Sequence, residues 1–111
     1  MYLYVMKAGN RCKIGKASDP QRRLKELQTG NPFDLELLAA FKCKSQSHAF
    51  YLEKLAHKVF ARYRINREWF KYRSEIYRFC INLDKQQREE ARALDLNARL
   101  DKEFFAIMES D

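Results

Sequence analysis

The sequence predicts an α/β (α+β) domain: a small mixed or antiparallel sheet of about three strands, flanked by helices and followed by a C-terminal helical extension. A chain of 111 residues is the length of one domain, and 46% hydrophobic residues are enough for a core. Short β-branched and aromatic segments precede longer segments with helical periodicity. Three glycines and two prolines leave little room for long linkers.

The N-terminal segment predicts a β-hairpin. Residues 2–6 combine aromatic and β-branched side chains, which favour a strand. Residues 7–10 predict a turn, because Gly9 and Asn10 tolerate positive φ. Residues 11–14 then return as the second strand.

A short helix with clear end signals follows the hairpin. Asp19 is a good N-cap, and Pro20 suits the first helical position because it needs no hydrogen-bond donor there. Gly30 stands where a helix C-cap glycine belongs. The apolar residues 34–43 predict a third strand.

The second half of the chain is predominantly helical in pattern. Residues 47–63 predict an amphipathic helix whose inner face consists of Leu52, Leu55, Ala56, Val59 and Tyr63. Residues 74–82 predict another helix, with Ile76, Phe79 and Cys80 facing inward. Residues 84–108 form a highly charged helical segment. Between these helices, the aromatic segment 67–72 predicts core packing for Trp69, as the preceding helix does for Phe60.

Charge is distributed unevenly along the chain. Residues 1–73 carry sixteen Lys and Arg against six Asp and Glu, a balance of +10. Residues 74–111 carry six against nine, a balance of −3. A basic body of this kind favours a polyanionic partner such as DNA, whose phosphates supply most of the affinity.

The remaining composition indicates an intracellular protein. No apolar run approaches the ~20 residues of a membrane span, and no signal peptide is recognisable. The three cysteines are far apart and form no C-x-x-C pair, so we expect buried thiols in a reducing compartment and no zinc site. The expected location is the cytoplasm, or the host cytoplasm if a phage encodes the chain.

The order of short motifs resembles the GIY-YIG nuclease superfamily. Tyr2-Leu3-Tyr4 stands where that family has Gly-Ile-Tyr, and Lys13-Ile14-Gly15 stands where it has Tyr-Ile-Gly. The segments 15–24, 52–57 and 68–70 are similar to a phage and bacterial branch whose second motif is Lys-Ile-Gly. The resemblance implies a DNA endonuclease that uses one divalent ion, Mg²⁺ or Mn²⁺.

The resemblance covers residues 1–72, which we take as a nuclease domain, with residues 73–111 as a helical extension. Glu53 occupies the family's metal position. Its place on the flank of an amphipathic helix suits a carboxylate that binds a hard cation. His57 lies one turn later on the same flank, as a metal neighbour or a phosphate contact.

Arg23 occupies the position of the family's phosphate-binding arginine. Helical geometry supports this choice: Arg23 lies roughly 70° from the centre of the face formed by Leu24 and Leu27, whereas Arg22 lies roughly 170° away. Arg22 therefore points to solvent as a surface contact for DNA. Lys16, after what we interpret as a tight turn at Gly15, is a second cation for nucleic acid.

Tyr4 is the general base that the resemblance implies. An unperturbed tyrosine has a pKa near 10, so it needs a nearby cation to act near neutral pH. Lys13 replaces the family's second tyrosine, and it lowers the pKa of Tyr4, holds phosphate, or acts as a base itself. Some relatives have a histidine or tyrosine at the position of Leu27, so in this chain that auxiliary role is either missing or supplied by another residue such as His57. Asn66 is the nearest candidate for the asparagine that completes the family site.

The C-terminal segment has two apolar stripes, Ala91, Leu94, Ala98, Phe105 and Met108 on one side and Leu96, Leu100 and Ile107 on the other. It packs on the domain or forms a homodimer with a second copy. Two other functions stay open: a non-catalytic DNA-binding module of the same fold, and a protein-binding inhibitor or regulator that works through the acidic helix.

Overall fold

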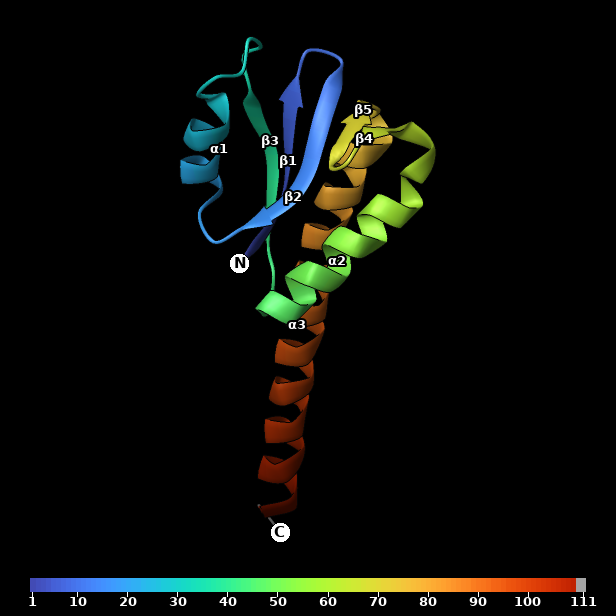
Figure 1. Cartoon of the computed structure of the whole chain (residues 1–111). Helices are drawn as coiled ribbons and strands as arrows, with labels where there is room; N and C mark the ends of the chain where they lie inside the picture. Colours follow the sequence, from blue (N-terminus) through green and yellow to red (C-terminus); the bar gives the residue numbers. More distant parts are fainter. Residues whose placement is uncertain (110–111) are drawn as a thin grey trace.

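The computed structural model describes residues 1–109, and it describes side chains for residues 1–95. Figure 1 shows the arrangement of the helices and strands. In chain order the elements are β1 (Tyr2–Ala8), β2 (Arg11–Ala17), α1 (Pro20–Gln28), β3 (Glu36–Lys42), α2 (Gln46–Val59), the 3-10 helix η1 (Ala61–Tyr63), β4 (Arg64–Asn66), β5 (Trp69–Lys71) and α3 (Ser74–Glu109). The predicted α+β class is confirmed.

Within residues 1–109 the sheet has five strands, in the order β3-β1-β2-β5-β4, and neighbouring strands are antiparallel. The sequence predicts about three strands because β4 and β5 have only three residues each, too few to show an alternating pattern. The predicted hairpin is present, and its turn contains Gly9 at a φ of 61°. β5 pairs with β2 only along Arg11–Lys13. Helix α2 also contacts β2.

The two faces of the sheet carry different side chains. Leu3 and Val5 belong to the main core, which lies between the sheet and helices α2 and α3. Tyr4 and Met6 alternate with them and are equally buried on the face that α1 covers. Figure 1 shows α1 on one side of the sheet, while α2 and α3 lie together away from it. The same strands therefore build a hydrophobic core and the floor of a polar site.

The helix ends follow the local signals. Asp19 caps α1 by accepting a hydrogen bond from the amide of Arg22 at 3.1 Å, and Pro20 is the first helical residue. Ser45 caps α2 through a 3.0 Å bond from the amide of His48. Gly30 has the positive φ, 79°, expected after a helix.

Two details of α2 differ from the prediction. The helix ends at Val59 instead of residue 63, and the chain continues as the 3-10 helix η1. Val59 is exposed, although the periodicity places it inward, whereas Ala56 in the same turn belongs to the main core. Phe60 is buried, as predicted, and packs edge-on against Phe79 of α3 at 5.6 Å between ring centroids.

The C-terminal part forms one continuous helix, α3, where the sequence suggests separate segments. Ile76 and Cys80 are buried and Phe79 is partly buried, as predicted, so the start of α3 belongs to the main core. Ala91 and Leu94 are exposed. The other residues of the two predicted stripes lie outside the described side chains, and both the 1–72/73–111 division and the homodimer stay predictions.

Two further features concern the cysteines and the membrane. Cys12, Cys43 and Cys80 are buried free thiols, as predicted. Within the described part of the chain, no helix combines the length and the apolar character that crossing a membrane requires.

Candidate active site

The centre of the site is the contact between Tyr4 and Gly15, which are directly opposite in the β1–β2 ladder. A Cβ atom on residue 15 would lie 2.6 Å from the Tyr4 hydroxyl oxygen and 2.7 Å from its Cζ. The phenol therefore lies directly over the glycine. The interpretation of Gly15 as a tight turn was wrong: it is a buried residue inside β2, where the missing side chain makes room for Tyr4.

Arg23 reaches the site from α1. Its guanidinium hydrogen-bonds the Tyr4 hydroxyl and contacts Glu26 at 3.3 Å. Its side chain is 43% exposed, whereas that of Arg22 is 79% exposed and only pairs with Glu26, at 3.4 Å. The helical geometry thus separates the two arginines as predicted: Arg23 faces the site and Arg22 faces solvent.

Burial dominates the titration of Tyr4. It raises the pKa of the phenol above its ordinary value, and the hydrogen bond from Arg23 opposes this rise only in part. The negative charges of Glu68 and Glu53 raise the same pKa further. Tyr4 is therefore a neutral phenol at pH 7 in the free protein.

Lys13 lies on the same sheet face as Tyr4, opposite Met6. Its side chain is almost buried, and its ammonium contacts the Glu68 carboxylate at 3.1 Å. From the sequence, Glu68 is the closest competitor to Glu53 for the metal position, but its motif favours a packing segment, so its place beside Lys13 and Tyr4 was not predicted. No local pattern marks it, because this contact depends on the pairing of β5 with β2.

Lys16 and Glu53 form a second pair, with 3.6 Å between Nζ and the carboxylate oxygen. The Glu53 side chain is only 12% exposed, in agreement with its predicted place on the flank of α2. Lys16 is more accessible, and its ammonium also lies 5.3 Å from the centre of the Phe50 ring. The predicted metal ligand is thus mostly buried and paired with a partly exposed cation.

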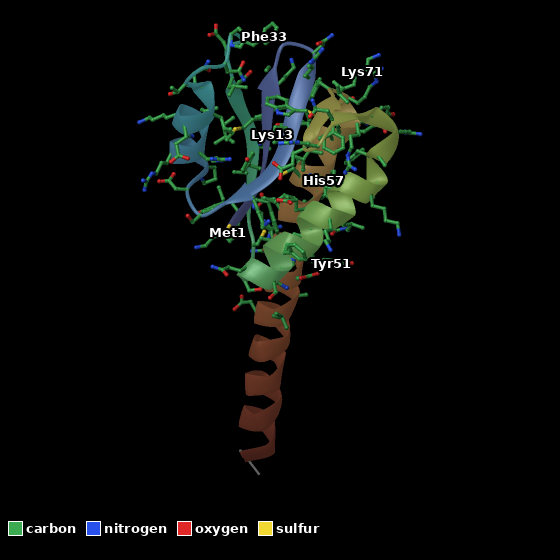
Figure 2. All side chains as sticks on the ribbon, viewed as in Figure 1. Met1, Lys13, Phe33, Tyr51, His57 and Lys71 are labelled. Carbon is green, nitrogen blue, oxygen red and sulfur yellow. The ribbon has the colours of Figure 1, made fainter. Side chains whose placement is uncertain are left out.

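His57 connects α2 to β2. Its Nε2 lies 2.8 Å from the carbonyl oxygen of Ile14, and its ring packs against Phe70 at 5.1 Å between centroids. The amide of Ile14 donates to the carbonyl of Glu68 at 3.2 Å. One nitrogen of His57 is therefore engaged with the backbone of β2. Figure 2 labels His57 on α2 and Lys13 on the sheet.

Asn66 lies in the short strand β4, opposite Trp69, and is exposed. It lines an open cavity of about 750 Å³ together with Lys13, Arg67, Glu68 and Trp69. The structure thus brings Asn66 beside Lys13, on the β5 side of the site. Trp69 is only half-buried, although the sequence predicts it in the core, and Phe70 is fully buried.

The site offers carboxylate oxygens, which suit a hard divalent ion such as Mg²⁺ or Mn²⁺. Among residues 1–95 there is no group of three or more His, Cys, Asp or Glu that could hold an ion. Magnesium is commonly bound by one or two carboxylates, with substrate phosphate and water as the other ligands. Glu53 fits that pattern, with the remaining ligands supplied by substrate and solvent.

One family model, that of the T5orf172 domain, matches residues 1–111. The chain belongs to the T5orf172 family. The assignment to the GIY-YIG superfamily was therefore wrong. Three-residue motifs, with Lys13 in place of a tyrosine, are too short to separate one family from another, whereas this model matches the whole chain.

Membership of this family indicates a general kind of function. The T5orf172 domain is a nuclease-associated type of domain, consistent with a DNA-related function. No curated protein and no solved structure matches the chain.

Proposed function

We propose that this T5orf172 chain is a metal-dependent DNA endonuclease that hydrolyses phosphodiester bonds. The observation that carries the proposal is the buried Tyr4 hydroxyl bonded to Arg23, with the Lys13–Glu68 and Lys16–Glu53 pairs close enough for both carboxylates to act on its pKa. Phosphodiester hydrolysis needs cations for the developing negative charge and a group that removes a proton from water. The site supplies both kinds of group within a strongly basic body.

Arg23 is the group that binds the scissile phosphate. Its planar guanidinium donates several hydrogen bonds, so it can keep its bond to Tyr4 and still contact a phosphate oxygen from its exposed side. Lys13 contributes a second positive charge on the same face of the sheet. The two cations place the phosphate next to the phenol.

Tyr4 is the proton acceptor in this proposal. Burial raises its pKa, so the phenol loses its proton only when positive charge around it increases. Arg23 already favours the phenolate through its hydrogen bond. We therefore expect the cleavage rate to increase from neutral to alkaline pH.

Glu53 would hold the divalent ion, Mg²⁺ or Mn²⁺, which supplies neutralising charge for the phosphate when bound. Lys16, now 3.6 Å from that carboxylate, would then be released to contact the DNA backbone. Arg22 and Asn66, both exposed, are additional contacts for nucleic acid.

The test is cleavage of supercoiled plasmid by the full chain with Mg²⁺, with Mn²⁺ and with a chelator. Glu53→Gln keeps the shape of the side chain and removes the charge that a cation requires. We expect it to lose cleavage by several orders of magnitude while it remains folded and binds DNA at least as tightly. Glu36→Gln, at an exposed position at the start of β3, is the matched control and should cleave normally.

A non-catalytic DNA-binding module is the second candidate, because both acidic side chains of the site are already paired with lysines. Wild-type protein that binds DNA but does not cleave it, whichever metal is added, would favour this candidate. Cleavage by Glu53→Gln at the wild-type rate would instead overturn the metal assignment.

A further inference from the structure

Next to the candidate site, two cavities adjoin on the α1 side of the sheet, and we call them together the groove. The cavity that contains Lys13 shares Asn66 and Trp69 with a second cavity of about 440 Å³. This second cavity extends across β2 at Arg11 to Phe33, in the loop between α1 and β3. The groove therefore runs from the candidate site to that loop.

The lining of the groove presents accessible apolar surfaces. Phe33 is 60% exposed, and Ile65 on the opposite side is also exposed. Neither residue belongs to the main core, so their place in the groove does not follow from folding. Trp69 lies between the two cavities and is half-buried. Aromatic side chains that remain accessible beside basic groups are typical of sites where nucleic-acid bases stack.

The polar lining favours an anionic ligand. Arg11, Lys13 and Arg67 are basic, and among residues 1–95 the only acidic residue that lines either cavity is Glu68, which already pairs with Lys13. Asn31 accepts a hydrogen bond from the amide of Phe33 at 2.9 Å through its Oδ1. Its amide NH₂ group is left as a donor for the edge of a base.

We propose that this groove binds an unpaired nucleotide of the DNA substrate, with the base against Phe33 and Trp69 and its phosphate at Arg11. The inference rests on the proposed DNA-cleaving function and specifies its substrate: DNA with a single-stranded segment next to the cleaved bond. Base faces are accessible for stacking only where strands are unpaired, whereas intact duplex would contact the basic rim alone. The volume of about 440 Å³ falls in the range of small-ligand pockets.

Trp69 is the only tryptophan of the chain, so its fluorescence reports directly on the groove. The full-length protein is titrated with a short oligothymidylate and, separately, with a blunt duplex, at one low salt concentration with a chelator to prevent cleavage. We expect saturable quenching by the single strand and little by the duplex.

The variant Phe33→Ala tests the stacking contact without disturbing the core. It should weaken binding of oligothymidylate by roughly five- to a hundred-fold, the usual effect of losing one stacked base, and leave duplex binding unchanged. Tyr51→Ala is the matched control: Tyr51 is 62% exposed and lies on α2, far from Phe33 in Figure 2. It should bind both probes as the wild type does.

Wild-type binding of oligothymidylate by Phe33→Ala, or equal quenching by the duplex, would overturn the inference. Plasmid cleavage tests the proposed function independently. Metal-dependent cleavage with no single-strand preference refutes the groove alone. Quenching by the single strand without any cleavage supports the groove and refutes the enzyme.

Discussion

Substituting Gly15 by Ala should separate folding from catalysis in a measurable way. The added Cβ would lie 2.6 Å from the Tyr4 hydroxyl and 2.7 Å from its Cζ, while ordinary contacts of this kind begin at 3.4 Å. The phenol must therefore move by about 0.7–0.8 Å. Tyr4 is fully buried, so this displacement also stretches its hydrogen bond to Arg23.

The magnitude follows from the crowding and from the displacement. Overpacking of a buried site costs about 1–3 kcal/mol, which a domain of ordinary stability, about 5–15 kcal/mol, tolerates. Misplacing a reacting group by nearly 1 Å costs about a hundred-fold in rate. Gly15→Ala should therefore fold, unfold at a lower urea concentration, and cleave plasmid about a hundred times more slowly.

The assay combines urea unfolding with initial rates of plasmid nicking. The double variant Gly15→Ala/Tyr4→Leu provides the control, because without the phenol the extra methyl group has room. The stability cost of Gly15→Ala should then be smaller than in the wild-type background. An unchanged urea midpoint together with a wild-type nicking rate for Gly15→Ala would refute the close contact and the placement of Tyr4.

Three other predictions concern charge and titration. Lys13→Met should lower the rate of nicking far more than the free energy of unfolding, because Glu68 is half-exposed and tolerates losing its partner. An unchanged nicking rate from pH 6 to 9 would make Lys13 a structural residue. Arg23→Lys should slow nicking by roughly ten-fold or more by losing the planar fork that binds Tyr4 and phosphate, and wild-type kinetics would contradict this. Burial raises the pKa of the Cys12 thiol from 9.0 to about 11 and that of the Cys80 thiol to about 12. Both thiols therefore lose their protons in the unfolded chain before they do so in the folded protein, and the free energy of unfolding falls as pH rises above 9. At pH 10 each thiol should lower the free energy of unfolding by about 1 kcal/mol, and equal urea midpoints at pH 8 and 10 would contradict the burial effect.

Signals within one element predicted their structures well. Asp19 and Pro20 start α1 as expected, since an N-cap and its helix are neighbours in sequence. The helical angle between Arg22 and Arg23 separated their environments for the same reason. The flank position of Glu53 likewise needed only the periodicity of its own helix.

Contacts between distant segments were not predictable in this way. The strands β4 and β5 were missed because each is stabilised by its neighbour in the sheet and not by a pattern of its own. The same pairing places Glu68 beside Lys13. The role of Gly15 depends on which residue faces it across the ladder, and a single sequence does not show that register.

The two hydrogen bonds of Ile14 have a consequence for the stability of the site geometry. Its amide is bonded to the carbonyl of Glu68, and its carbonyl is bonded to His57, one helical turn after Glu53. Both acidic side chains are thus positioned from a single residue in the middle of the hairpin. Thermal movement in the outer loops should leave their separation nearly constant, whereas local opening of β2 at Ile14 would release both together.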